Sequence, residues 1–578
     1  MIWILAVFFP LLLACICLIC RIQERYRGVL AALAPLPALG LSVFGADVAP
    51  LEVPSFLLGM HFGFGEYGRY FLLLMAMVWT GAGFFSACSM RHDPDLGSYT
   101  ILFLLAMCGN LGLAVAKDVV TFYAFFSLMT FSAYSLVIHN DTPAAWKAGH
   151  IYLVMAVLGE GMLIAGLMIS VHVADSVMFL EISRAVAGLS PAHPMFFLLF
   201  AGFGIKAGIL GLHFWLPLAH PAAPTPASAV LSGAMIKAGL LGWLYFFPVE
   251  AVCMPSWGAF FMCIGLLGAF FGVLAGLLEK EPKSILAYSS ISQMGLMSFL
   301  LGLALFDAGL AARALPGIFI FIMHHGLAKA ALFIGVGATK YARGQGFSTL
   351  LLLAALALPA LALAGAPFTS GIQVKYLMKE LASMGPMYSF TGVVLPLSSL
   401  GTTLLMAHFL YRVRQEMKPA EKAYPRDQAL VWLLMVAASA GLPWITVRAF
   451  EMIPAAWQAD SGFIWGGFWP VLLGVILYPA IKSKAPLQTM SRYWPVTVEV
   501  MERLWGHAYG KWRRSPLCDP SCGQINYVYM LDKYIYGRKS LETPCSIEFR
   551  LRQWPVAGFL FVILILVFAG LGMIIHGE

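Results

Sequence analysis

The stretch of sequence that decides the fold is Leu212-His-Phe-Trp-Leu-Pro-Leu-Ala-His-Pro-Ala-Ala-Pro-Thr-Pro-Ala-Ser-Ala-Val-Leu-Ser-Gly-Ala-Met-Ile-Lys-Ala-Gly239. Four prolines, at positions 217, 221, 224 and 226, interrupt a helix here, because proline removes a backbone hydrogen bond. An apolar run follows and contains one charged side chain, Lys237. Within a membrane, backbone that is not helical is tolerated only where it is buried in protein or lines a cavity. The stretch therefore predicts a broken membrane helix followed by a helix with a charge inside it.

The composition of the whole chain indicates a membrane protein. Of its 578 residues, 60% are hydrophobic and 11% are charged, and the mean hydropathy is +0.83. Soluble chains contain about 45–50% apolar and about 25% charged residues. The composition therefore excludes a soluble multidomain protein, a disordered chain, an ordinary nucleic-acid-binding protein and a disulfide-stapled secreted domain.

Sixteen apolar runs are long enough to span a membrane, for which a helix needs about 20 residues. One set of alternate loops holds 26 of the 36 Lys and Arg residues and the other set holds 5. Since basic loops stay in the cytoplasm, we expect a bacterial or archaeal inner-membrane protein with both termini outside. The net charge of +8 then lies at the cytoplasmic face, where it favours acidic lipids and needs no nucleic-acid partner. The expected spans are 1–20, 29–46, 69–90, 97–115, 119–139, 149–172, 195–218, 226–248, 257–278, 284–305, 314–337, 349–383 (broken), 389–411, 428–447, 463–481 and 554–575.

Several ionisable residues lie inside these apolar runs. Lys206, Lys237 and Lys329 are each flanked on both sides by apolar residues, and Glu160 is the clear carboxylate within a span. An ionisable group costs at least about 2.5 kcal/mol at the bilayer centre, so it commonly faces the protein interior and marks an ion path. In apolar surroundings the pKa of a lysine falls, so that the side chain can exchange a proton near physiological pH. The row of lysines therefore predicts a proton relay.

Some of the ionisable residues have a simpler interpretation. A lysine near the end of a span can extend to the membrane surface, which fits Lys379 and Glu380 and is the alternative for Lys283. Histidines titrate near neutral pH, so His324 and His325, which precede the third buried lysine by about one turn, are candidates for the relay. A hydrogen-bonded core histidine is the alternative for each of them.

A second interruption lies in the run 349–383. Pro359, Pro367 and Gly371 precede Lys375 there. Paired interrupted segments in two halves of a chain indicate an inverted repeat with its site near the middle of the membrane. The two interruptions are five spans apart, and because five is odd the two halves would have opposite orientations.

With these features together, the stretch 212–239 resembles the signature of the proton-conducting antiporter-like membrane subunits. This superfamily includes large membrane-arm subunits of respiratory complex I, their counterparts in membrane-bound nickel–iron hydrogenases and formate hydrogenlyase, and large subunits of multisubunit sodium/proton antiporters. Segments 281–295 and 325–333 carry further matches, and the resemblance covers about 97–410. It implies an all-α polytopic membrane protein of about 16 transmembrane helices, with two inverted five-helix repeats and two broken helices. The expected division is 1–96 (N-terminal helices), 97–248 (first repeat), 257–411 (second repeat), 428–481 (additional helices), 482–553 (polar segment) and 554–578 (C-terminal helix).

The resemblance also implies roles for the buried lysines. Lys206 is similar to the lysine of the first broken helix, Lys237 to the bridging lysine of the next span, and Lys329 to the lysine of the central relay. Lys375 is similar to the terminal residue in the second broken helix, from which family members exchange protons with the outside. Lys283 matches a lysine of the cytoplasmic-side pattern. The expected proton relay consists of Glu160, Lys206, Lys237, Lys283, His324, His325, Lys329 and Lys375.

One position departs from the family pattern. Family members usually carry a glutamate in the fifth span as the ion-pair partner of the first broken-helix lysine, whereas this chain has Ser127 there. A serine carries no charge with which to modulate Lys206. Our hypothesis is that Glu160, one span later, replaces the missing partner. The alternative is that this chain has lost proton coupling and serves as a structural subunit.

The polar segment 482–553 contains apolar residues at helical spacing, which predicts an amphipathic helix at the cytoplasmic membrane surface or against a neighbouring subunit. Its cysteines, Cys518, Cys522 and Cys545, do not match common zinc or iron–sulfur spacings. No nucleotide-binding or nucleophile motif occurs elsewhere in the sequence. We therefore expect no catalytic, cofactor-binding or metal-binding residue in this chain.

The expected function is proton translocation within a redox-driven respiratory or hydrogenase-type complex. Other membrane subunits and a peripheral redox module would be the partners, and iron–sulfur clusters, flavin or a nickel–iron centre would belong to those partners. The first alternative is a subunit of a multisubunit sodium/proton antiporter, which exchanges sodium as well as protons. The second is a structural membrane anchor.

Overall fold

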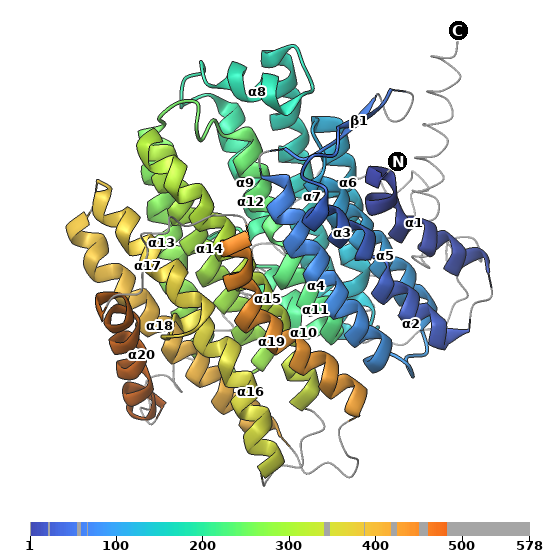
Figure 1. Cartoon of the computed structure of the whole chain (residues 1–578), viewed down its shortest axis with the longest axis vertical. Coiled ribbons are helices and arrows are strands. Elements are labelled where there is room, and N and C mark those ends of the chain that lie inside the picture. The colour runs from blue at the N-terminus through green and yellow to red at the C-terminus, as the bar shows by residue number, and fades with distance from the viewer. Residues whose placement is uncertain are drawn as a thin grey trace, which may run out of the picture.

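The computed structural model describes residues 2–20, 23–54, 59–65, 67–339, 347–386, 388–417, 425–449 and 461–482. Long helices stand side by side in one bundle, with short elements at its upper end in the view of Figure 1. In chain order the elements are α1 (Ile2–Ile19), α2 (Glu24–Leu33), α3 (Leu36–Phe44), β1 (Leu51–Val53), β2 (Met60–Phe62), α4 (Gly68–Ser89), α5 (Leu96–Ala114), α6 (Val119–Ile138), α7 (Pro143–Ala174), α8 (Phe179–Val186), α9 (Pro194–Ala207), α10 (Leu216–Ala222), α11 (Thr225–Val230), the π-helix η1 (Leu231–Met235), α12 (Lys237–Phe246), α13 (Pro255–Leu278), α14 (Pro282–Phe306), α15 (Ala308–Thr339), α16 (Phe347–Ala364), α17 (Ser370–Met384), α18 (Tyr388–Glu416), α19 (Arg426–Ala449) and α20 (Ser461–Lys482).

Within the described residues, twelve helical stretches are long and apolar enough to cross a membrane. Three shorter apolar helices, Pro194–Ala207, Thr349–Ala364 and Trp465–Ile481, lie at three further expected spans. The prediction of an all-α polytopic membrane protein is therefore confirmed. The count of sixteen stays a prediction, because the last expected span, 554–575, and the polar segment 482–553 lie outside the described residues apart from Lys482.

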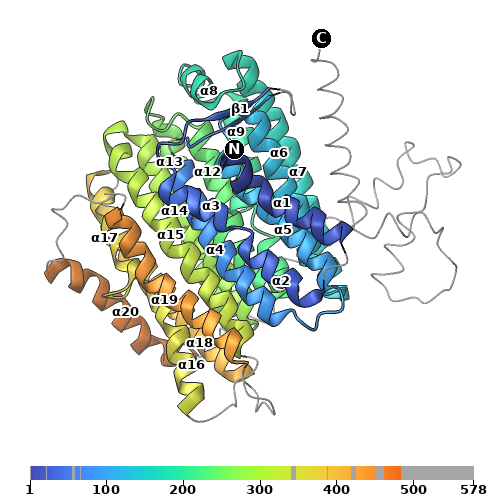
Figure 2. The ribbon, with the colours of Figure 1, turned by 45° about the vertical axis from the view of Figure 1, so that its right-hand side comes forward.

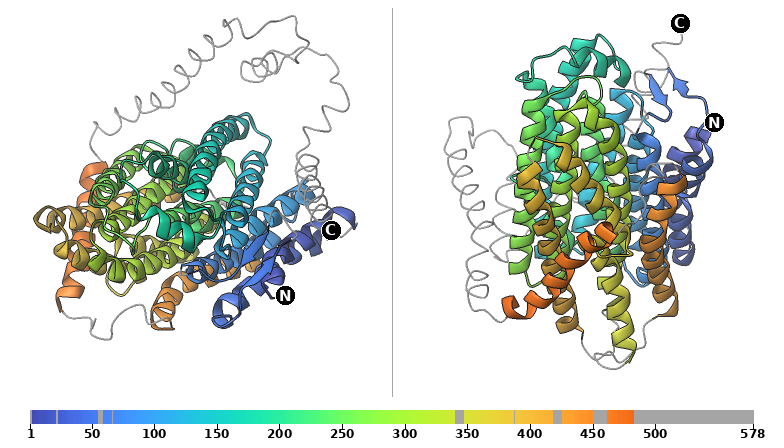
Figure 3. Two further views of the ribbon diagram at one scale, coloured as in Figure 1. Left: turned by 90° about the horizontal axis from the view of Figure 1, so that it is seen from above. Right: turned by 60° about the vertical axis from the view of Figure 1, so that its left-hand side comes forward.

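The lysine-bearing helices lie at the centre of the bundle. The stretch Thr225–Phe246 and α15 are buried along their apolar length, and α14 is nearly so. α15 packs against α4, α11, α14, α16, α17 and α19. Seen from above, the N-terminal helices lie at one side of the bundle and α17, α18 and α20 at the other (Figure 3, left), as the rotated view also shows (Figure 2). Charges on the central helices are therefore kept from lipid by the surrounding protein.

The first broken helix consists of α9, a non-helical connection and α10. Gly208 and Gly211 in the connection have φ angles of 69° and 87°, a region that glycine adopts without steric cost. The indole Nε1 of Trp215 donates to the carbonyl oxygen of Ile205 at 2.8 Å, which satisfies an acceptor at the end of α9. The prolines follow the break, beginning with Pro217 in the first turn of α10. The helix is interrupted again between α10 and α11, where Ala223 and Pro224 have extended ψ angles of 149° and 151°. The expected interruption is therefore present, and both glycines and prolines make it.

The second broken helix consists of α16 and α17. In the connection, Gly365 has a φ of 83° and Phe368 has a φ of 62°. Positive φ angles are uncommon for residues other than glycine, so the backbone at Phe368 is unusual. Pro367 lies between them, as the sequence predicts. α17 then begins at Ser370 and carries Lys375 in its second turn.

Gly371 lies where α17 comes closest to α16. A Cβ atom at Gly371 would lie 1.8 Å from the carbonyl oxygen of Ala362 and 3.1 Å from Cε1 of His324. We therefore expect Gly371→Ala to lower the Tm of the purified protein in detergent, since overpacking costs about 1–3 kcal/mol. Gly392 of α18 has open space around it, so Gly392→Ala is the matched control. An unchanged Tm for Gly371→Ala would contradict this close approach.

A small antiparallel hairpin, which was not expected from the sequence, lies at the same end of the bundle as α8 (Figure 1). Leu51 of β1 lies opposite Phe62 of β2. Isolated bridges join Phe62 to Ala116 and Asp118 to Met178. Strands of three residues carry too little periodicity to be recognised from sequence.

Candidate functional site

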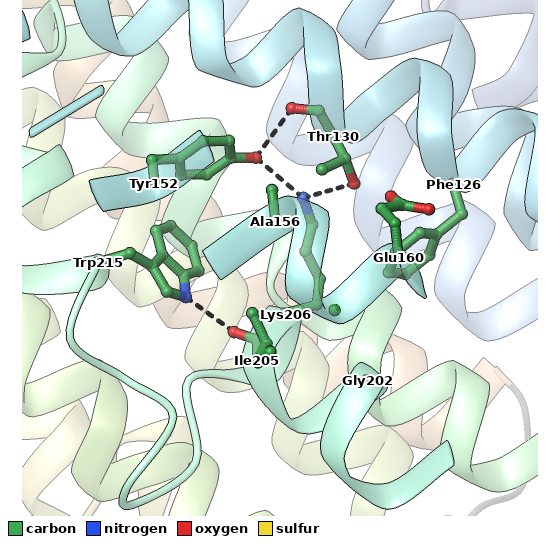
Figure 4. A pocket seen from close by; sticks show the side chains of 10 residues that line it. Phe126, Thr130, Tyr152, Ala156, Glu160, Gly202, Ile205, Lys206 and Trp215 are labelled. Carbon is green, nitrogen blue, oxygen red and sulfur yellow. Dashed lines mark hydrogen bonds between the residues drawn. The ribbon is translucent and has the colours of Figure 1, made fainter. Parts of the chain in front are cut away.

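Lys206, near the C-terminal end of α9, is held by groups from two neighbouring helices (Figure 4). Its Nζ donates to Oγ1 of Thr130 on α6 and to the hydroxyl of Tyr152 on α7, each at 3.3 Å. Tyr152 in turn donates to the carbonyl oxygen of Thr130 at 3.0 Å. Nζ also lies 5.8 Å from the ring centre of Phe126, a distance at which a cation is attracted to an aromatic face. Neutral groups therefore support the ammonium of Lys206 directly.

Glu160 of α7 lines the same small cavity as Lys206 (Figure 4). Its Oε2 accepts a hydrogen bond from Oγ of Ser127 on α6 at 2.8 Å. Its Oε1 is buried and has no hydrogen-bond partner among the described residues. The cavity offers about 20 Å³ to the centre of a water-sized sphere, and about 10–15 Å³ is enough for one water. A water there would connect the carboxylate with Lys206.

Lys237 is the first residue of α12, and only Ile236 separates it from the π-helix η1. π-Helical turns within α-helices are frequent at functional sites. Nζ of Lys237 is buried and donates to the carbonyl oxygen of Ser232 in η1 at 2.5 Å. The hydroxyl of Ser232 lies 2.7 Å from the hydroxyl of Ser290 on α14. Polar contacts therefore extend from the turn before Lys237 to α14.

Lys283 and Lys329 also donate to backbone carbonyl groups. Nζ of Lys329 donates to the carbonyl oxygen of Leu286 on α14 at 2.7 Å. Nζ of Lys283 donates to the carbonyl oxygen of Ala223 at 2.7 Å, at the junction of α10 and α11. Lys329 is 0% exposed and Lys283 is 6% exposed. Lys283 is therefore buried against the first broken helix.

His220 on α10 lies among these lysines, although it was not one of the residues expected from the sequence. The residue is fully buried, and neither Nδ1 nor Nε2 has a hydrogen-bond partner among the described residues. Its ring stacks on Phe333 of α15 with centroids 4.5 Å apart. It lies within electrostatic reach of Lys283, Lys329 and Lys237. A histidine between the prolines of the signature stretch was the signal that could have identified it.

The second broken helix brings together the remaining candidate residues. Nδ1 of His324 lies 2.8 Å from Oγ of Ser370, and that hydroxyl donates to the carbonyl oxygen of Ser439 at 3.2 Å. His324 is therefore hydrogen-bonded, as the simpler interpretation expects. Both ring nitrogens of His325 and Nζ of Lys375 are buried without hydrogen-bond partners among the described residues. Buried polar groups without a protein partner are commonly satisfied by ordered water.

Lys379, one turn after Lys375 on α17, contacts a different part of the bundle. It is partly buried, and its Nζ donates to the carbonyl oxygen of Gly466 on α20 at 3.3 Å. None of the expected relay residues takes part in this contact. Lys379 therefore serves as a reference lysine in the experiments below.

Within the described ranges, no group of three or more His, Cys, Asp or Glu side chains is arranged to hold a metal ion. Nothing in this part of the chain therefore identifies a residue that would bind a metal.

The sequence matches the profile of the family described as NADH:quinone oxidoreductase/Mrp antiporter, transmembrane, over residues 116–410. Hydrogenase-4 component B of Escherichia coli (strain K12) is 30% identical over 317 residues, which are 52% of this chain and 45% of that protein. Putative antiporter subunit mnhA2 of Staphylococcus epidermidis is 27% identical over 393 residues, which are 63% of this chain and 49% of that protein. The chain thus spans about half the length of these curated relatives.

Two solved structures share the fold. A chain of the Mrp complex from Dietzia sp. DQ12-45-1b has a TM-score of 0.74 at 20% identity, over 94% of this chain and 64% of that one. A chain of the membrane-bound sulfane sulfur reductase, an archaeal respiratory membrane complex, has a TM-score of 0.65 at 19% identity, over 82% of this chain and 98% of that one. At these identities the likeness concerns the fold alone.

Proposed function

Because the chain belongs to the NADH:quinone oxidoreductase/Mrp antiporter transmembrane family, we propose that it translocates protons as an antiporter-like membrane subunit of a redox-driven respiratory or hydrogenase-type complex. The observation that carries this proposal is the set of buried lysines whose Nζ atoms contact neutral hydroxyl or carbonyl groups. Lys206, Lys237 and Lys329 are of this kind. A lysine held by neutral groups can lose its proton without leaving a bound carboxylate unpaired.

Electrostatic coupling between neighbouring sites would move the protons. Two unit charges 4 Å apart interact by about 4 kcal/mol at an effective dielectric constant of 20. Each change of about 1.4 kcal/mol shifts the proton affinity of a group by one pKa unit. Redox chemistry in partner subunits would change the charge at one end of the row, and the lysines would load and release protons in turn. Electrons would not pass through this chain.

Glu160 takes the place of the glutamate that Ser127 replaces in the family pattern. Ser127 donates to Oε2 of Glu160 at 2.8 Å, so the carboxylate reaches from α7 to the position on α6 where the family usually has one. It lines one cavity with Lys206. This placement favours proton transfer through Lys206 over the alternative of a structural subunit that has lost proton coupling.

His220 is expected to take part in proton transfer between Lys283 and the central lysines. We expect His220→Asn to lower proton translocation at least about tenfold, since proton transfer by a positioned side chain typically contributes about 10²–10⁴-fold. Proton uptake by liposomes that contain the assembled complex measures this. The control is His150→Asn, because His150 is exposed on α7. Equal rates for the two variants would exclude His220 from the relay.

A sodium/proton antiporter is the second candidate function. It is supported by the relative named as an antiporter subunit and by the Mrp fold neighbour, which covers 94% of this chain. The redox-coupled function is supported by the relative that is a hydrogenase component and by the respiratory complex with a TM-score of 0.65. Proton uptake driven by electron transfer in sodium-free liposomes separates the two. An exchanger would require sodium.

A further inference from the structure

A second cavity lies at the end of the bundle that carries the basic loops, which the charge bias places in the cytoplasm. It offers about 240 Å³ to the centres of water-sized spheres, which is room for several waters. Its wall comes from α4, the connection after α4, the segment after α6, the α10–α11 junction, α14, α15 and α19. Oγ of Ser89 in this wall is buried without a partner among the described residues, as expected of a group that a water satisfies.

Two charged side chains line this cavity, Asp93 and Lys283. Asp93 is 20% exposed, and its Oδ1 lies 3.1 Å from Nε2 of His139, whose side chain is 6% exposed. Lys283 is more deeply buried and donates to the carbonyl oxygen of Ala223. The cavity wall therefore carries the partly exposed carboxylate of Asp93, which His139 contacts, and the buried amino group of Lys283.

The arginine nearest to this pair in sequence has another partner. Arg91 binds Asp427 of α19 at 2.7 Å. The ring of Tyr99 on α5 stands edge-on to His139, with centroids 5.1 Å apart. Further charged or titratable side chains on the surrounding connections and helix ends include His92, Asp95, Asp141, Lys147, Glu281 and Arg426.

We propose that this cavity is the proton-uptake site of the protein and that the Asp93–His139 pair collects protons from bulk water. One proton adds to the carboxylate–imidazole pair, leaves it through the waters of the cavity and adds to Nζ of Lys283 after that group has passed its own proton on to His220. No electron moves in this step. From Lys283 the proton reaches His220 and the central lysines. The inference rests on the proton translocation proposed above.

A collecting group matters most when protons are scarce. With a diffusion-limited rate constant on the order of 10¹⁰ M⁻¹ s⁻¹, water at pH 8 delivers on the order of 10² protons per second to one site. Enzyme turnover numbers of about 1–10³ s⁻¹ are of the same order. At pH 6 the supply is about a hundredfold greater and no longer limits turnover. Loss of the pair should therefore slow proton translocation at high pH and not at low pH.

The first test is the pH profile of Asp93→Asn in the assembled complex. We expect this change to lower the rate of proton translocation about threefold or more at pH 8 and to leave it nearly unchanged at pH 6. The control is Asp141→Asn, because Asp141 lies on the same face outside the cavity wall. Its left-handed backbone, with a φ of 47°, tolerates asparagine. A profile for Asp93→Asn parallel to that of the wild type overturns the inference, whereas a wild-type complex that moves no protons overturns the proposed function.

The second test does not depend on the stability of Asp93→Asn. Thr225 lines the cavity, so Thr225→Cys should react with a small, charged, water-soluble thiol reagent. Ser298→Cys, on the fully buried part of α14, should not react. Peptide mass spectrometry locates the modified cysteine among the native ones. A Thr225→Cys side chain as unreactive as Ser298→Cys would mean that the cavity is closed to water, and the inference would be wrong.

Discussion

Replacing Lys206 with alanine is expected to lower proton translocation by the assembled complex at least about tenfold, which corresponds to about 1.4 kcal/mol in the barrier. Lys206 is the charged group that Thr130, Tyr152 and the cavity with Glu160 surround. Alanine removes the proton-carrying group and leaves Glu160 without its counter-charge. Proton uptake by liposomes, normalised to the amount of complex, measures the effect.

The matched control is Lys379→Ala. Lys379 is a partly buried lysine on α17 that contacts the carbonyl oxygen of Gly466 on α20. Its replacement should leave the rate of proton translocation within about a factor of two of the wild type, because a typical intramolecular hydrogen bond contributes only about 0.5–1.5 kcal/mol to stability and this one involves no expected relay residue. Intact assembly of the Lys206→Ala complex with unchanged proton uptake would support a structural anchor.

Replacing Glu160 with glutamine is the second change with a large expected effect. Glutamine keeps the size of the side chain and an oxygen that can accept the hydrogen bond from Ser127, whereas the charge is lost. Because Glu160 and Lys206 line the same cavity, loss of the carboxylate charge removes its electrostatic influence on Lys206, and the proton affinity of Lys206 should no longer follow events at Glu160. We expect proton translocation to fall at least about tenfold in the same liposome measurement.

A charge relocation tests whether Glu160 substitutes for the missing glutamate of α6. In the double variant Ser127→Glu, Glu160→Ala the carboxylate returns to the helix on which the family usually carries it. The space that Glu160 vacates is next to Ser127, since the two side chains are hydrogen-bonded. We expect the double variant to translocate protons faster than Glu160→Ala alone. If Glu160→Gln translocates protons at the wild-type rate, the hypothesis about Glu160 is wrong.

The main features of the fold follow from the sequence because the membrane imposes a strong constraint. A span needs a long apolar run, and a charge within such a run must face protein, so Lys206, Lys237 and Lys329 stand out in the sequence alone. The two interrupted helices stand out because prolines and glycines are conspicuous within apolar runs. The prolines were the visible signal of the first break, and the backbone is extended at Pro224. It also turns at Gly208 and Gly211, which the prolines did not indicate.

The contacts between helices could not be predicted from the sequence. The burial of Lys283 depends on the carbonyl oxygen of Ala223, which is 60 residues away along the chain, and no local pattern separates it from a lysine at the membrane surface. His220 is a candidate because the folded chain brings it near Lys283, Lys237 and Lys329. That Glu160 replaces the missing partner of Lys206 was a hypothesis from the family pattern. Glu160 lines one cavity with Lys206 and accepts a hydrogen bond from Ser127, and the replacement itself stays a prediction.

The most direct test of the central claim is proton uptake by sodium-free liposomes that contain the intact complex, driven by electron transfer in the partner subunits. We expect uptake that needs no sodium and that is lost in the double variant Lys206→Ala, Lys237→Ala while the electron-transfer components remain assembled. Uptake that requires sodium, or that continues at the wild-type rate in the double variant, would contradict proton translocation through the buried lysines.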